Sequence, residues 1–175
     1  IAIHAIVATT LFDAIVTLLA KNKYGEIIAI PLAIGFINAS RSLASVCGPF
    51  VLSRYISRDT LGYFIIAESV SLFLWGLSAD YFYTSLVGSF LSGLFLTTIW
   101  SYSMTMFQEE VDSRYFGRAI AYNDMFFTFI ATASAICIGL FLESGVSEGG
   151  AIMMIGGLFL VAGLSYGSFR EKLGI

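Results

Sequence analysis

Long apolar stretches alternate with short polar breaks along the whole chain. Six of these stretches approach or exceed the length of about 20 helical residues that crosses a hydrocarbon core about 30 Å thick. They cover residues 2–20, 27–52, 61–79, 82–106, 119–142 and 149–168. Lipid offers the backbone no hydrogen-bonding partner, so each stretch is predicted to be a helix. We therefore expect an all-α membrane protein in which residues 1–175 form one bundle of six transmembrane helices.

Composition agrees with this pattern and excludes a water-soluble domain. Hydrophobic residues make up 58% of the chain and charged residues 12%, against about 45–50% and about 25% in soluble domains. The expected surroundings are therefore a lipid bilayer. The net charge of −3 gives no reason to expect a nucleic acid partner.

Lysine and arginine placement predicts the orientation, because these residues are enriched in cytoplasmic loops. With six spans, both ends and the second and fourth loops fall on one side. That side carries Arg54, Arg58, Arg114, Arg118, Arg170 and Lys172, whereas the other carries Lys21 and Lys23. We expect both ends of this segment to be cytoplasmic, in a protein of a bacterial inner membrane.

Two oppositely charged residues lie deep inside the first two predicted spans, where an ionised side chain is costly and usually functional. Asp13 is about eleven residues from the start of its span, and Arg41 is eleven residues from Leu52. At 1.5 Å of rise per residue both lie about 17 Å from the same face. An Asp13–Arg41 ion pair is therefore predicted. It either marks a transport route or merely joins two helices.

Polar neighbours share the helix faces of this predicted pair. Asn38, Arg41, Ser42 and Ser45 fall on one face at helical spacing, and so do Thr10, Asp13 and Thr17. We expect these side chains to supply the hydrogen bonds that a buried ion pair requires.

Two further carboxylates lie nearer the predicted cytoplasmic face. Glu68, about 10 Å deep, belongs to a polar seam with Ser71 and Ser78. Asp124, about 8 Å deep, follows Asn123. Either carboxylate is a candidate proton carrier. For Asp124, a favourable charge in the first turns of a helix is an equal alternative.

Enzymatic chemistry is not expected. His4 is the only histidine, which leaves no metal cluster and no histidine-based triad. Gly76 and Ser78 resemble the G-x-S motif of intramembrane serine proteases, but that family takes its histidine from a later span. No phosphate-binding loop and no cofactor site is present. The alternatives to a transporter are a non-transporting membrane subunit or scaffold and, less favoured, a six-span intramembrane protease.

Two segments resemble loops of the major facilitator superfamily. Residues 48–58, GPFVLSRYISR, resemble its G-x-x-x-D-R-x-G-R-R loop, with Ser53 in place of the aspartate. Residues 108–118, QEEVDSRYFGR, resemble its Q-x-x-V-P-x-x-x-R-G-R segment, with one residue more. The positions that carry the resemblance are Gly48, Arg54, Arg58, Gln108, Arg114, Gly117 and Arg118.

The resemblance implies a secondary active transporter of twelve spans, of which this chain is the carboxyl-terminal half. Such halves are three-plus-three inverted repeats, and a small-molecule substrate binds near the midplane between them. The expected partner is an amino-terminal six-span half, and proton coupling and export are favoured. In that family the first, second, fourth and fifth helices of a half face the cavity. The cavity candidates are therefore Asp13, Asn38, Arg41, Asn123 and Asp124, and Glu68 would be peripheral.

Overall fold

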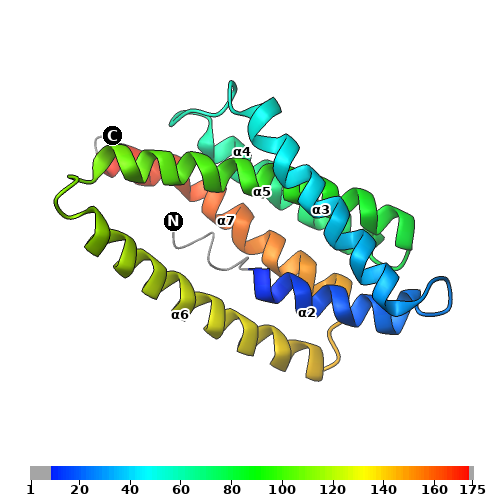
Figure 1. Ribbon diagram of the computed structural model, residues 1–175. Coiled ribbons are helices and arrows are strands. Elements are labelled where there is room, and N and C mark those ends of the chain that lie inside the picture. The colour runs from blue at the N-terminus through cyan, green and yellow to red at the C-terminus, as the bar shows by residue number, and fades with distance from the viewer. Residues whose placement is uncertain (1–8, 174–175) are drawn as a thin grey trace.

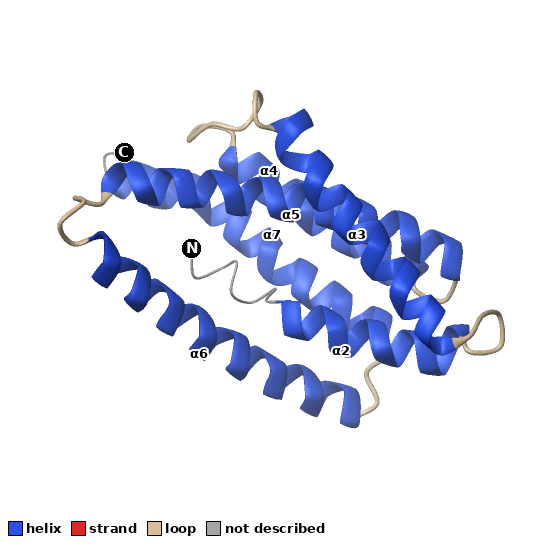
Figure 2. Cartoon of the chain, viewed as in Figure 1, coloured by secondary structure: helices blue, strands red, loops and turns tan. Residues whose placement is uncertain are grey.

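The computed structural model describes residues 9–173, and the side chains of residues 12–166. The chain forms helices joined by short loops, and the described residues contain no strand (Figures 1 and 2). The elements, in order, are α2 (Thr9–Leu19), the π-helical turn η1 (Ala20–Tyr24), α3 (Ile30–Leu52), α4 (Leu61–Ser78), α5 (Phe82–Glu110), α6 (Phe116–Glu143) and α7 (Glu148–Leu173).

Five of the described helices, α3 to α7, are long and apolar enough to cross a membrane. They coincide with the second to sixth predicted spans, so the all-helical prediction is confirmed, and the length and apolarity of these helices are compatible with an integral membrane protein. The first predicted span, 2–20, is seen only as α2, because residues 2–8 lie outside the described residues.

Two predicted loop segments are partly helical. Gly48 lies within α3, and Gln108 lies within α5, which continues to Glu110. Gly117 and Arg118 lie in the first turn of α6. Gly48 thus lies within its predicted span, 27–52, whereas α5 and α6 extend a few residues beyond the predicted span ends and include Gln108, Gly117 and Arg118. Hydropathy locates the edge of the hydrocarbon core, whereas a helix retains its own hydrogen bonds beyond that edge.

The tightest packing joins α3 to α5 and α4 to α7, and α4 also packs along α5. Glycines permit the close approach, as expected for membrane helices. A Cβ atom added at Gly48 of α3 would collide with the carbonyl of Leu94 and the hydroxyl of Thr98 on α5. A Cβ atom added at Gly76 of α4 would lie 2.7 Å from the carbonyl oxygen of Gly149 on α7.

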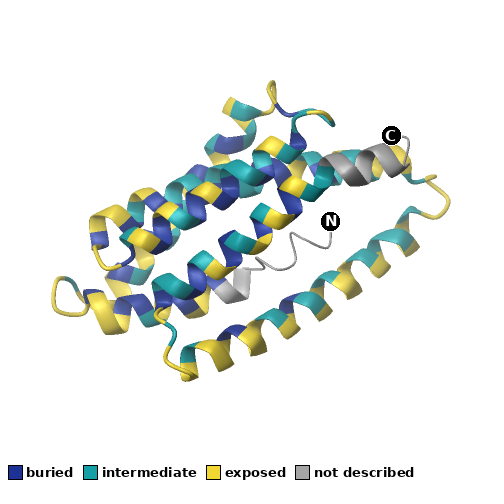
Figure 3. Ribbon diagram, turned by 180° about the vertical axis from the view of Figure 1, so that it is seen from behind, coloured by how far each residue is buried: buried dark blue, intermediate teal, exposed yellow. Residues whose placement is uncertain are grey.

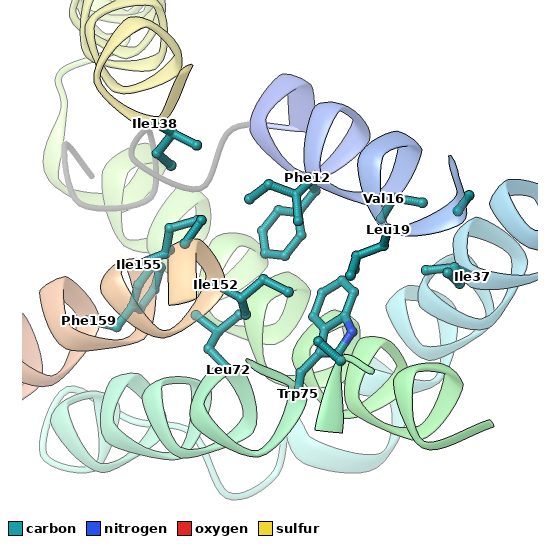
Figure 4. Close-up of a cluster of buried hydrophobic side chains, with 14 of the residues drawn as sticks. Phe12, Val16, Leu19, Ile37, Leu72, Trp75, Ile138, Ile152, Ile155 and Phe159 are labelled. Atoms are coloured by element: carbon teal, nitrogen blue, oxygen red, sulfur yellow. The ribbon is translucent and has the colours of Figure 1, made fainter. Parts of the chain in front are cut away.

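The hydrophobic core lies where α2, α4 and α7 meet (Figure 4). Phe12 of α2 stacks on Trp75 of α4, with ring centroids 5.4 Å apart and planes 8° apart. Ile152, Ile155 and Phe159 of α7 complete this layer, and all five side chains are fully or almost fully buried. These contacts fix α2 against the α4–α7 pair.

Helix α6 is set apart from this packing. It runs along one side of the molecule and is exposed along most of its length (Figures 1 and 3). Only 11% of its apolar window is buried, and Ala131 and Ile138 are its buried residues. Most of its apolar surface therefore faces away from the other described helices.

The loops gather at two ends of the bundle. At one end, which we call the lysine end, Lys23 bonds Asp80 of the α4–α5 turn and Asn22 bonds Glu148 of α7. At the opposite end, the arginine end, Arg58 of the α3–α4 loop pairs with Glu110. The predicted separation of Lys21 and Lys23 from the loop arginines is confirmed. Which end is cytoplasmic remains a prediction.

Candidate functional site around Arg41

Arg41 and Asp13 form the ion pair that the sequence predicts. The Nη2 atom of Arg41 lies 3.7 Å from Oδ1 of Asp13, joining α3 to α2. The arginine side chain is 17% exposed and the aspartate side chain 57% exposed. Charge-assisted hydrogen bonds are typically about 2.7–2.9 Å long. Asp13 is therefore attracted to Arg41 while its oxygens remain accessible to another donor.

Phe12 is a further partner of Arg41 that the sequence reasoning missed. The guanidinium carbon of Arg41 lies 5.2 Å from the centroid of the Phe12 ring, within the range of a cation–π interaction. The same ring stacks on Trp75. An aromatic residue directly before Asp13 is the signal that could have suggested this contact.

The backbone of Arg41 is held against α5 by a glycine. A Cβ atom added at Gly93 would lie 2.6 Å from the carbonyl oxygen of Arg41 and 2.9 Å from its Cγ atom. The absence of a side chain at position 93 lets α3 approach α5 closely enough for this contact. Ser40, next to Arg41, donates a hydrogen bond of 2.8 Å to the carbonyl of Leu86 on α5. The position of Arg41 is thus set by both α2 and α5.

Among the described side chains, the predicted hydrogen bonds from neighbouring hydroxyls to the ion pair are not formed. Ser45 donates to the carbonyl oxygen of Arg41 at 2.9 Å, and Thr17 donates to that of Asp13 at 2.7 Å. Serine and threonine inside helices commonly bond the carbonyl one turn earlier in this way. Ser42 is exposed, and the side chain of Thr10 lies outside the described residues.

Asn38 lies one turn before Arg41 on α3. Its Oδ1 atom is buried and has no hydrogen-bond partner. A buried acceptor left without a donor costs about 1–3 kcal/mol. Asp13 therefore offers accessible acceptor oxygens beside the guanidinium group, and Asn38 offers a further, buried acceptor one turn earlier on α3.

Asn123 and Asp124 are not brought to this site by any polar contact. Asn123 lies 3.4 Å from Asp124 through Nδ2 and Oδ1. Within the described residues, no hydrogen bond or ion pair joins either of them to Asp13, Asn38 or Arg41. Asp124 lies in the third turn of α6, which begins at Phe116. Charge stabilisation by the helix dipole falls off within the first turn, so that alternative for Asp124 loses its basis.

Glu68 is enclosed between helices. Its side chain is fully buried, and Ser92 of α5 donates a hydrogen bond of 2.7 Å to its Oε1 atom. Ser71 and Ser78, the predicted members of the same polar seam, donate to carbonyls of their own helix and not to Glu68. The serine on α5 could not have been chosen from sequence spacing, since 24 residues separate it from Glu68.

A polar cluster closes the lysine end. Lys23 bonds Asp80 at 2.8 Å, and this hydrogen bond with the carboxylate charge raises the pKa of Lys23. The buried hydroxyl of Tyr24 donates to the carbonyl of Ala79 and lies 2.6 Å from Oγ of Ser85. Asn22 donates to Glu148 at 2.6 Å. These bonds join η1, the α4–α5 turn and α7.

An ion pair spans the arginine end. Nη2 of Arg58 lies 2.6 Å from Oε1 of Glu110, and this hydrogen bond raises the pKa of Arg58. The Tyr166 hydroxyl donates to the Arg58 carbonyl at 3.1 Å. Beside the pair lies a cavity of about 280 Å³, lined in part by Leu61 and Ser103. The α3–α4 loop is thus fastened to α5 and α7.

The remaining motif arginines lie at the same end. The guanidinium of Arg54 lies over the ring of Tyr55, 4.7 Å from its centroid. The backbone N–H of Arg114 donates to Asp112 at 2.8 Å in the turn that precedes α6. Arg118 is exposed in the first turn of α6.

Comparison of the chain with protein-family models, with curated proteins and with solved structures found no match. The resemblance of the two loops to the major facilitator superfamily therefore remains a prediction. The functional argument rests on the site chemistry, because a fold alone does not specify a function.

Proposed function

We propose that this chain is one half of a major-facilitator-type secondary transporter, which moves a small solute by alternating access with proton coupling and favours export. The observation that carries the proposal is the Asp13–Arg41 pair in the middle of apolar helices. Arginine inside a membrane is costly and characteristically marks a substrate or ion route. The 57% exposure of the Asp13 side chain leaves its carboxylate accessible.

The pairing of helices supports a three-plus-three inverted repeat that includes a first span extending from α2. In such a repeat α2, α3 and α4 are equivalent to α5, α6 and α7, in that order. The contact between α4 and α7 therefore corresponds to itself. The α3–α5 contact maps onto α6–α2, and α4–α5 onto α7–α2. All of these pairs are in contact, although α2 makes fewer contacts with α6 and α7 than their counterparts make.

The exposed surfaces of α3 and α6 support a missing partner half. Only 17% of the apolar window of α3 and 11% of that of α6 is buried within this chain. In the proposed transporter, parts of these surfaces face the central cavity and the amino-terminal half. The remaining part faces lipid.

The chemistry of the site suggests the class of solute. Arg41 can bind an anionic group such as a carboxylate or phosphate. Asp13 and Asn38 can accept hydrogen bonds from an amine or hydroxyl group. The favoured solutes are therefore small organic anions that also carry hydrogen-bond donors.

The test is solute flux in proteoliposomes that contain the full-length protein, with and without an imposed pH gradient. A panel of labelled organic anions and zwitterions is compared for the wild type, Arg41→Gln and Asp13→Asn. Lys21→Gln is the matched control, because it removes an exposed basic residue that lies outside both motif loops. Loss of saturable flux in the first two variants at normal protein levels supports the proposal.

Other outcomes count against it. Flux that survives both substitutions while protein levels fall makes the ion pair a link between two helices. Flux that is insensitive to the gradient removes proton coupling. A folded protein that transports none of the panel favours the scaffold alternative.

A further inference from the structure

Glu68 occupies a sealed position between two helices. Its carboxyl group lies opposite Ser92, and both residues have no solvent-exposed surface. Ser92 donates one hydrogen bond to Oε1, and Oε2 is buried with no partner at all. A carboxylate normally accepts several hydrogen bonds, so this carboxyl group is only partly satisfied.

No charge compensates this carboxyl group in the described part of the chain. From α5 it faces the Ser92 hydroxyl, and one turn away Ser89 bonds the carbonyl of its own helix at 3.0 Å. From α7 the nearby polar contact is the Gly156 carbonyl, which accepts a hydrogen bond from Ser69 at 2.7 Å.

The described titratable side chains of α5 and α7 lie at least two helical turns from the Glu68 contact. Each is at least eight residues, or about 12 Å of helical rise, from Ser92 or Gly156. In the described part of these helices they are Tyr83, Tyr102, Glu109, Glu110, Glu148 and Tyr166.

Arg41 is the one basic residue deep within the described spans, and it is committed elsewhere. It lies against Gly93 of α5, pairs with Asp13 and covers the Phe12 ring. It therefore does not act as the counter-ion of Glu68.

We propose that Glu68 is a proton-binding site that closes the α4–α5 interface. An unpaired ion in such surroundings is much more costly than the neutral acid. The proton resides on Oε2 while Ser92 donates to Oε1. When the O–H bond breaks, the proton passes to water and the carboxylate remains on α4. The ion requires additional donors, and it obtains them when the two helices separate and water enters.

The face of α5 that lines this interface is suited to such an opening. Ser85, Ser89 and Ser92 follow one another at helical spacing, and all three are fully buried. Ser85 already bonds Tyr24 and Trp75 at the lysine end. Hydroxyl groups along this face can bind the water that accompanies the carboxylate, which a purely apolar face could not do.

The proton site itself is independent of transport, whereas its role in coupling rests on the proposed function. Proton release at Glu68 would change the packing of α4 and α5, and α5 also carries Gly93, on which Arg41 rests. Protonation at Glu68 and solute binding at Arg41 would then act on the same helix at the adjacent residues Ser92 and Gly93.

Infrared difference spectroscopy of the full-length protein in lipid vesicles tests the proton site. We expect a carboxylic-acid carbonyl band at neutral pH that disappears in Glu68→Gln and persists in the control Asp124→Asn. The absence of such a band at neutral pH, or its persistence in Glu68→Gln, would overturn the proposal whether or not flux is detected.

Ser92→Ala provides a second variant if Glu68→Gln does not fold. It removes the donor to the carboxylate, so the acid band should persist to a pH higher by about one unit, which is tenfold in proton concentration. Ser89→Ala removes an equally buried hydroxyl that bonds the carbonyl of Leu86 on its own helix and should leave the titration unchanged. Equal titrations in both variants would count against the proposal.

Spin labels at the exposed positions Val70 of α4 and Val87 of α5 test the opening. We expect the distance between the labels to increase as the pH rises in the otherwise wild-type protein and to stay constant in Glu68→Gln. A distance that does not change while the acid band titrates would refute the coupling of proton release to helix separation. If Glu68→Gln retains both the acid band and gradient-driven flux, the coupling proton binds at another residue.

Discussion

The guanidinium of Arg41 lies over the ring of Phe12, 5.2 Å from its centroid, and the same ring stacks on Trp75. A charge in the middle of α3 is therefore linked through an aromatic pair to the buried core. Such an arrangement stabilises the cation without a second anion, because the aromatic ring presents negative potential at its face. Arg41 consequently depends on α2 through two contacts, Phe12 and Asp13.

Replacing Phe12 with leucine should loosen this link. Leucine retains most of the apolar volume but removes the cation–π contact and the stacking on Trp75. We expect a loss of about 1–3 kcal/mol, measured as a lower thermal unfolding midpoint in detergent. Phe129→Leu on α6 is the control, because that side chain is 71% exposed. Equal midpoints for the two variants would show that the Phe12 contacts contribute nothing specific.

Replacing Gly48 with alanine should disrupt the α3–α5 interface. The added Cβ atom would lie 2.8 Å from the Thr98 hydroxyl and still closer to the Leu94 carbonyl, so the helices must shift apart. Overpacking of this kind typically costs about 1–3 kcal/mol. Gly35→Ala on the same helix meets nothing within 4 Å and should be neutral or slightly stabilising. Thermal unfolding distinguishes the two, and a stable Gly48→Ala protein would contradict the close packing.

The Lys23–Asp80 pair predicts an alkaline dependence of stability. The pKa of Lys23 is raised above 10.5 in the folded state. Its contribution is therefore fully present below pH 10.5 and is lost as the pH rises through the folded value. The effect should be small and weakened by salt, because the pair is exposed. Lys23→Met should remove this part of the pH dependence of unfolding, whereas Lys21→Met should retain it.

The Arg58–Glu110 pair should restrict access to the neighbouring cavity at the arginine end. Ser103, which lines the neighbouring cavity, is replaced by cysteine in a protein that lacks Cys47 and Cys137. We expect Arg58→Glu to increase the rate of thiol labelling at position 103 severalfold, because like charges separate the loop from α5. The exchange of both charges, Arg58→Glu with Glu110→Arg, should restore the slow rate. Unchanged labelling in the single variant would show that the pair does not restrict access.

The sequence predicts most of the helices but few of their partners. Hydropathy locates α3 to α7 because length and apolarity are local properties. The depth of Asp13 and Arg41 along their spans is also local, and it suffices to predict their pairing. Ser92 as the partner of Glu68 depends on how α4 and α5 face each other. Glycine-mediated packing determines which faces of the two helices meet. A single sequence does not reveal how the helices are rotated and aligned against each other.

Hydroxyl side chains illustrate the same limit. Ser45 and Thr17 share helix faces with Arg41 and Asp13, and spacing alone suggests that they support the ion pair. The nearest acceptor for each, however, is the backbone carbonyl one turn earlier. The sequence also predicts the depth of Asn123 and Asp124 along their span. Their distance from α2 and α3, however, depends on the position of α6.

The isolation of α6 has a consequence for how the protein is assembled. Its apolar window has a mean hydropathy of 2.2, against 1.3–1.7 for the windows of α3, α4, α5 and α7. A segment this apolar partitions from the translocation channel into lipid without help from neighbouring segments. Helix α6 can therefore enter the bilayer independently and dock late, whereas the serine-rich α5 depends on α3 and α4 to cover its hydroxyl groups. Biogenesis should accordingly be sensitive to changes in α5 and tolerant of changes on the lipid-facing surface of α6.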